Sequence, residues 1–158
     1  MSFFTINLIL ALLWASLQSF TPTDLIGGFI LGYLILWTLH RWLGPEAYHY
    51  TRRMPMFLRF FLYLCKEIVV STVQVSIMIF RDERTLKPGI IALPLSTRTE
   101  LELVLFHILV VIIPGTMGVA LSPDQKILYI HTIDVSDPDK MRADIKNGLE
   151  RRLLEVMR

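Results

Sequence analysis

The hydrophobic residues of this chain are concentrated in two long runs near its N-terminus. Residues 3–20 and 25–43 are almost wholly apolar, and each is close to the ~20 residues that a helix needs to cross a ~30 Å hydrocarbon core. The polar residues between them include Pro22, which can end one helix, and Asp24, which can cap the next. The pattern predicts a transmembrane helical hairpin over residues 1–43.

A third apolar run, residues 56–80, carries a regular set of polar positions. They recur at steps of seven or eight residues and are Arg59, Lys66, Glu67, Gln74 and Arg81. On a helix this spacing gives one narrow polar stripe, which is typical of an amphipathic helix. If the helix crossed the bilayer, Lys66 and Glu67 would lie near the midplane, where each charge costs at least ~2.5 kcal/mol.

Basic residues on both sides of the third run bear on its topology. Those before it are Arg41, Arg52, Arg53 and Arg59, and those after it are Arg81, Arg84, Lys87 and Arg98. The positive-inside rule places both flanks in the cytoplasm, whereas a helix that crosses once has its two ends on opposite sides of the membrane. We therefore favour a helix that lies in the membrane interface or against partner helices. A third crossing is the alternative, because in a complex the polar stripe could face polar groups of other subunits.

Shorter elements follow residue 88. They are a strand over 90–95, a helix over 98–113, two strands over 117–121 and 126–133 that form a hairpin, and a final helix. This order, β-α-β-β-α, predicts a small α+β domain over residues 89–158. Residues 44–88 then form a basic loop and the third helix, which join the hairpin to the domain.

The final helix has the clearest pattern in the chain. Asp137 is a suitable N-cap, Pro138 suits the first helical position, and Asp139 lies in the first turn. Apolar residues recur every three or four positions at Met141, Ile145, Leu149, Leu153 and Val156. We expect this stripe to cover one face of the sheet.

The overall composition agrees with a membrane protein. Of the 158 residues, 53% are hydrophobic and only 19% are charged, which is too apolar for an ordinary soluble domain of this size. The formal net charge of +2 and the absence of a basic patch interleaved with aromatic residues exclude a nucleic-acid partner. Cys65, the only cysteine, cannot form an internal disulfide, and we expect it to be a packing residue.

No catalytic or metal-binding pattern is present in the sequence. The four histidines, at positions 40, 49, 107 and 131, are scattered and lack a carboxylate at one-turn spacing. Asp134, Asp137 and Asp139 lack the Gly and the distal Glu of a calcium loop, so helix capping is the better explanation. We therefore predict that the chain is not an enzyme and binds neither a cofactor nor a metal.

The candidate functional residues are instead candidates for contact with other molecules. Gly28 and Gly32 form a GxxxG element that allows close approach of a second helix, either within the hairpin or in a partner subunit. Lys66, Glu67 and Gln74 are candidate contacts with other subunits or lipid headgroups. Lys66 and Glu67 point about 100° apart on a helix, and an ion pathway is the alternative role for them.

Two secure spans can neither enclose a pore nor build the midplane site of a transporter. The pattern therefore favours a chain that works within a larger membrane complex. A membrane-anchored regulatory or ligand-binding module is the alternative.

Several motifs, in their order, resemble those of the E subunit of multisubunit Na+/H+ antiporters of the Mrp type. They are Leu-Leu-Trp-Ala (12–15), Gly-Phe-Ile-Leu-Gly (28–32), Lys66-Glu67-Ile68, Ile-Ala-Leu-Pro-Leu (91–95), Pro114-Gly115-Thr116, Leu-Tyr-Ile-His (128–131) with Asp134, Ile145-Lys146 and Glu150-Arg151-Arg152. The resemblance spans essentially the whole chain, and Pro114, Gly115 and Thr116 are its candidate structural signature.

This resemblance implies a multi-pass protein of the cell membrane whose partners are the other antiporter subunits and the lipid bilayer. The large subunits would hold the ion pathways, and this chain would be an accessory, non-catalytic subunit that stabilises the assembly and supports Na+ efflux coupled to H+ uptake. Its C-terminal domain is expected in the cytoplasm.

Overall fold

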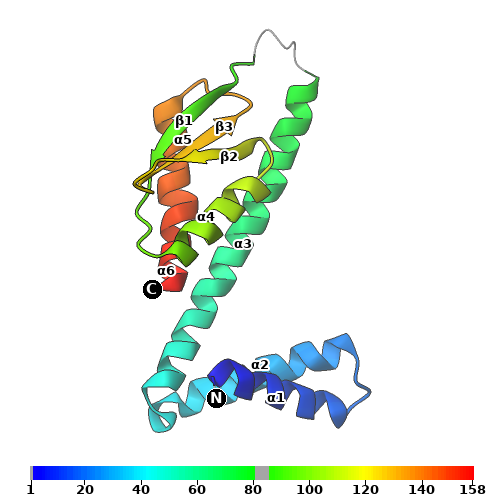
Figure 1. The fold of residues 1–158 in the computed structure, drawn as a ribbon. Helices are drawn as coiled ribbons and strands as arrows, with labels where there is room; N and C mark the ends of the chain where they lie inside the picture. The colour runs from blue at the N-terminus through cyan, green and yellow to red at the C-terminus, as the bar shows by residue number, and fades with distance from the viewer. Residues whose placement is uncertain (1, 81–85) are drawn as a thin grey trace. The chain divides into compact units, whose positions relative to one another are not determined.

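The computed structural model describes residues 2–80 and 86–158, which divide into two compact units at Leu58 and Arg59. The first unit is helical, and the second combines the later part of a long helix with a small three-stranded sheet and further helices (Figure 1). A helical N-terminal region followed by a small α+β domain was predicted, and this is confirmed. Arg81 and Arg84, which entered the prediction of the stripe and the basic flanks, lie outside the described residues.

The predicted hairpin consists of α1, Phe3–Ser16, and α2, Pro22–Leu43. Helix α1 has 14 residues and ends before the predicted boundary at residue 20. Helix α2 begins earlier than predicted because Pro22 is its first residue, not the terminator of α1. The N-cap is Thr21, whereas Asp24 is the third helical residue and accepts from the Thr21 backbone at 3.0 Å. The N-cap therefore lies three residues before the expected Asp24, which instead completes a capping box with Thr21.

Helix α3, Pro45–Ile79, is much longer than predicted. The basic stretch that we expected to be a loop is helical from Pro45 onward. Gly44, with φ +93°, ends α2, and Pro45 and Glu46 favour an immediate new start. Among the described residues, α2 and α3 have the length and hydropathy to cross a membrane, whereas α1 is a shorter apolar helix.

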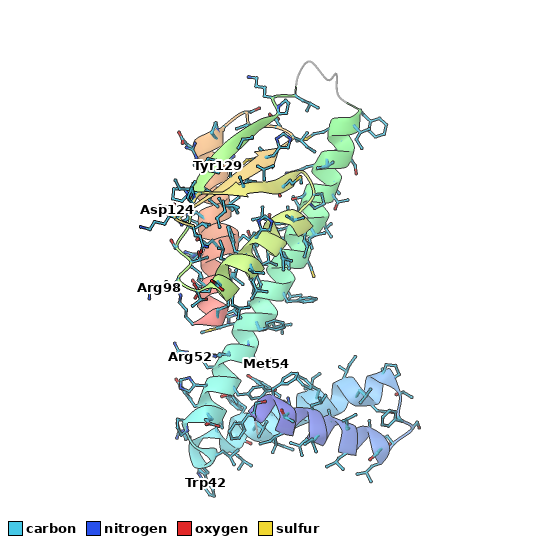
Figure 2. All side chains as sticks on the ribbon, in the orientation of Figure 1. Trp42, Arg52, Met54, Arg98, Asp124 and Tyr129 are labelled. Carbon is cyan, nitrogen blue, oxygen red and sulfur yellow. The ribbon has the colours of Figure 1, made fainter. Side chains whose placement is uncertain are left out.

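The sheet contains β1, Gly89–Pro94, β2, Thr116–Leu121, and β3, Ile127–Thr132. Its order is β1-β3-β2, and both pairs are antiparallel. The predicted strands and hairpin are present, and Figure 2 shows Asp124 in the hairpin turn, where it accepts from the Ser122 hydroxyl at 2.5 Å. A bulge between Gly118 and Ala120 interrupts the β2 register.

Helices pack on one face of this sheet. Helix α4, Glu100–Ile112, lies between β1 and β2 in the chain. The C-terminal helix runs from α5, Pro138–Asp144, through a π-helical segment, Ile145–Glu150, into α6, Arg151–Met157. Its start is as predicted, since the Asp137 side chain accepts from the Lys140 backbone.

The core of the second unit joins the sheet, α4, the C-terminal helix and α3. Its buried members are Phe60, Ile91, Leu93, Phe106, Val110, Leu128, Ile130, Leu149 and Leu153. The predicted stripe is confirmed, because Met141, Ile145 and Val156 pack against this cluster beside Leu149 and Leu153. The π-helical segment was not predicted.

Candidate functional site

The glycines of the GxxxG element face α1. A Cβ atom on Gly28 would lie 2.9 Å from the Ala11 carbonyl oxygen, and one on Gly32 would collide with the Asn7 side chain. On α1 the buried positions are Asn7, Ala11 and Ala15, so small residues approach on both sides. Of the two alternatives that the sequence left open, the structure shows close packing within the hairpin.

Asn7 is a buried polar residue inside this apolar contact. It is fully buried, and its Nδ2 donates to the Tyr50 hydroxyl at 2.7 Å. Within the described part of the chain its Oδ1 has no hydrogen-bond partner and faces Gly32. The Asn7–Tyr50 bond therefore ties α1 to the beginning of α3. Sequence reasoning missed this role, although an Asn inside an apolar run was a usable signal.

A second polar contact holds the same part of α3. Pro55 lies inside the helix and has no N–H, so it cannot donate to the carbonyl of Thr51. The Tyr33 hydroxyl of α2 donates to that oxygen at 2.9 Å instead. This contact supplies the donor that the proline removes, which is the kind of compensation that an apolar environment requires.

The remaining surface of the hairpin is largely apolar and exposed. Phe4, Leu13, Ile26 and Ile30 are among its exposed residues. Trp42, at the end of α2, is 89% exposed and points away from the helices in Figure 2. Its place beside His40 and Arg41 is typical of a residue at a membrane interface.

The candidate residues of α3 lie on different sides of the helix. Lys66 is exposed, whereas Glu67 is half-buried and lines a groove of about 660 Å³ between α3 and the C-terminal helix. Gln74, though exposed, lies along the same groove. The side chains of Lys66 and Glu67 thus point to different sides of α3, as their adjacent positions on a helix predicted. Cys65 is exposed, so the packing that we expected of it is not against the described part of this chain.

Tyr63 of α3 lies close to two residues of the opposite wall of the groove. The Arg152 guanidinium lies 4.0 Å from the centroid of the Tyr63 ring. A Cβ atom on Gly148, in the π-helical segment, would collide with the Tyr63 hydroxyl. The groove also contains acidic residues from the C-terminal side, Asp137 and Asp144.

Pro114 and Gly115 form the turn between α4 and β2, and Thr116 is the first residue of β2. Gly115 has φ +88°, a conformation that favours glycine. The Thr116 hydroxyl lies 2.7 Å from the Val110 carbonyl oxygen and 3.0 Å from that of Ile113, so it caps the end of α4. These three residues thus join the end of α4 to the start of β2.

Two buried carboxylates hold the loop between β1 and α4. Glu102 accepts from the Arg98 backbone at 2.7 Å and from Arg158 Nη2 at 3.1 Å. The hydrogen bonds from Arg158 and from the Arg98 backbone lower the pKa of Glu102 to about 2. Glu150 accepts from the Ser96 backbone at 2.5 Å and pairs with Lys146 at 2.7 Å.

Sequence reasoning did not single out this network. Thr99 and Glu102 have the spacing of a capping box, which was a usable signal for part of it. The contact with Arg158 could not have been found, because it joins residues far apart in the chain. Among the residues that the structure describes, no three His, Cys, Asp or Glu side chains are grouped as metal ligands would be.

These features define a class of protein: a helical, membrane-anchored chain with a small α+β domain after its apolar helices. The family model described as a Na+/H+ ion antiporter subunit matches residues 7–156. The chain belongs to this family.

Two relatives illustrate the relationship. The E subunit of the Na+/H+ antiporter from Alkalihalophilus pseudofirmus is 34% identical over 152 residues, which cover 96% of this chain and 95% of the relative. The E subunit of the Na+/H+ antiporter from Bacillus subtilis is 29% identical over 154 residues, covering 97% of this chain and 96% of the relative. The similarity therefore extends over both units.

Two solved structures share the fold. A chain of the Mrp complex from a Dietzia species has a TM-score of 0.50 and 23% identity, covering 65% of this chain and 96% of that one. A chain of an archaeal membrane-bound sulfane sulfur reductase has a TM-score of 0.57 and 19% identity, covering 99% of both. At these identities the likeness concerns the fold alone.

Proposed function

We propose that this chain is an accessory, non-catalytic subunit of a multisubunit Mrp-type Na+/H+ antiporter in the cell membrane. The observation that carries the proposal is the family match over residues 7–156, which includes both the apolar helices and the domain. Its partners are the other subunits of the antiporter and the lipid bilayer. Its role is to stabilise the assembly and to support Na+ efflux coupled to H+ uptake.

The surface of the helices supports a role in assembly. The small residues of the hairpin are used between α1 and α2, so larger apolar side chains such as Leu13, Ile30 and Ile35 remain exposed. Exposed apolar surface of this extent must be covered by lipid or by protein. We propose that neighbouring subunits and lipid share this surface.

The distribution of charge supports a cytoplasmic domain. His40 and Arg41 lie in the last turn of α2, and Arg52 and Arg53 follow on α3, whereas the first turn of α2 carries Asp24. The positive-inside rule then places the α2–α3 end of the hairpin in the cytoplasm. We propose that residues 1–43 are the membrane hairpin, residues 44–88 the connecting region and residues 89–158 the cytoplasmic domain.

Purification of the complex from its own membranes tests the proposal. An affinity tag on this chain should retain several larger membrane proteins in mild detergent, and Na+-dependent proton movement in everted vesicles should fall when the chain is deleted. A matched control is Gly27→Ala, because among the described residues nothing lies within 4 Å of the position of the added atom. Two results would together contradict the proposal: purification of the tagged chain alone in a folded state, and unchanged antiport in vesicles from the deletion strain.

The groove in the second unit favours one other function. At about 660 Å³ it has the size of a ligand site, so a membrane-anchored regulatory or ligand-binding module is the second candidate. Saturable binding of a small cytoplasmic solute by the full chain, abolished by Gly148→Leu at the wall of the groove, would favour this function. In that case antiport would respond to the solute in the complete complex.

A further inference from the structure

The second half of α3, residues 59–79, has the folded domain along one side. Phe60 belongs to the core of the domain, and Tyr63 and Leu64 pack against it. Further along, Val75 Cγ2 is 3.0 Å from the position of a Cβ atom on Gly115, and Met78 lines the groove. The domain therefore accompanies this helix for about five turns.

The opposite side of the same helix is apolar and exposed. At about 100° per residue, the side opposite Phe60 and Glu67 contains Phe61, Leu62, Cys65, Val69 and Val73. All five are exposed, and Leu62 and Val69 are exposed by 59% and 62%. A helix with a folded domain on one side leaves this surface for another apolar medium.

Two hydroxyl groups on this surface are satisfied within the helix itself. Thr72 Oγ1 donates to the Ile68 carbonyl oxygen at 2.6 Å, and Ser76 Oγ donates to that of Thr72 at 2.8 Å. Neither hydroxyl hydrogen therefore needs water as a partner. The surface can enter hydrocarbon without leaving these donors unpaired.

The charges beside the apolar surface are those that suit lipid headgroups. Arg59 and Lys66 are exposed and lie seven residues apart, so they project from the same flank, between the apolar surface and the domain. Long basic side chains in this position can reach the phosphate groups of a bilayer while their stems remain in apolar surroundings.

We infer that residues 59–79 lie flat on the bilayer, with Phe61, Leu62, Val69 and Val73 in lipid and the domain held against the headgroups. A crossing would instead carry Asp137, Lys140 and Asp144, which line the groove beside α3, to hydrocarbon depth. Charged groups and irregular backbone are not stable there when exposed to lipid. This inference goes beyond the proposed function, because it identifies lipid as the partner of one named surface.

Spin-label depth measurements on the complete complex test the inference. Single cysteines are placed at Leu62, Val69 and Ser76 in a Cys65→Ser background, and the complex is reconstituted in vesicles of phosphatidylethanolamine and phosphatidylglycerol. Collision with oxygen and with a water-soluble nickel chelate gives the depth of each label. Thr72→Cys and Ser71→Cys form a matched pair of adjacent positions, the first in the apolar surface and the second in the groove.

The three outer labels should lie at one shallow depth, with oxygen collisions at least several-fold more frequent at Thr72→Cys than at Ser71→Cys. A depth that increases to the midplane and decreases again along the helix would show a crossing and overturn the inference. Labels shielded from both reagents would show that a protein covers this surface and would overturn the inference. Labels freely accessible to the nickel chelate would show that the surface faces water and would overturn it as well. Only variants that still co-purify with the other subunits are measured, so failure here is distinct from failure of the proposed function.

Discussion

Tyr33 and Thr51 are joined by a hydrogen bond that compensates for a proline. The Tyr33 hydroxyl donates at 2.9 Å to the Thr51 carbonyl oxygen, the acceptor that Pro55 cannot serve. Together with the Asn7–Tyr50 bond, this contact fixes the first turns of α3 to the hairpin. The internal proline of α3 thus lies at a point where α2 supplies the missing hydrogen-bond donor.

Replacing the donor tests this relationship directly. Tyr33→Phe should lower the free energy of unfolding by about 1–3 kcal/mol, because a half-buried carbonyl loses its partner. Pro55→Ala restores the helical N–H, so Tyr33→Phe should cost clearly less in that background. Thermal unfolding of the natural protein, the two single variants and the double variant in detergent gives the coupling energy. An equal loss in both backgrounds would show that the two residues act independently.

Close packing of the hairpin predicts a contrast between neighbouring glycines. Gly32→Ala should destabilise the protein by about 1–3 kcal/mol, because the added carbon collides with the Asn7 side chain. Gly27→Ala should be neutral or stabilising by up to about 1 kcal/mol, since it removes a helical glycine at an open position. Unfolding of the two variants under identical conditions measures the difference. Similar stabilities would mean that the α1–α2 contact is looser than described.

The contact between α3 and the C-terminal helix predicts a rescue. Gly148→Ala should destabilise the second unit by about 1–3 kcal/mol, because the new methyl group meets the Tyr63 hydroxyl. Tyr63→Phe removes that oxygen and should recover part of the loss. Urea unfolding, monitored by the protease resistance of residues 89–158, measures both effects. Absence of any rescue would place the cause of the loss elsewhere than at Tyr63.

The Glu102 network predicts a specific dependence on pH. Because the pKa of Glu102 is about 2 in the folded protein and about 4.3 in an unfolded chain, its stabilising contribution is complete above about pH 5. As the pH falls through 4.3 toward 2, that contribution is lost. At neutral pH, Glu102→Gln should cost about 1–3 kcal/mol, and the difference from the natural protein should shrink on acidification.

A surface pair provides the control for this experiment. Asp139 is 91% exposed in its pair with Arg142, and Asp139→Asn should change stability by less than about 1 kcal/mol. Melting temperatures of the three proteins between pH 3 and pH 7 give the comparison. A constant gap between the natural protein and Glu102→Gln over this range would contradict the assigned pKa.

The sequence predicts the elements best where one pattern dominates. The stripe from Met141 to Val156 and the Asp137 cap were predicted correctly, because helical spacing and capping are local properties. The hairpin turn at Asp124 was found for the same reason. Boundaries were less accurate where two signals compete. Pro22 and Pro45 both begin helices, whereas a proline can also be interpreted as a terminator.

Long-range contacts account for most of what sequence reasoning missed. Helix α3 continues through Pro55 because Tyr33 supplies a donor from another helix. Glu102 meets Arg158, the last residue of the chain, through the packing of α4 against α6. Neither contact produces a periodic pattern in the sequence, so the pairing of these residues could not be predicted from it. Where Cys65 packs could not be predicted either, because an apolar run does not tell which side of a helix is covered.

The proposed accessory role is tested most directly by reconstitution. Proton uptake driven by a Na+ gradient is measured in vesicles that contain the complete complex, the complex without this chain, or this chain alone. We predict activity with the complete complex, a marked loss when the chain is omitted and recovery when it is added back, with no flux from the chain by itself. Na+-dependent proton flux in vesicles that contain only this chain would contradict that role.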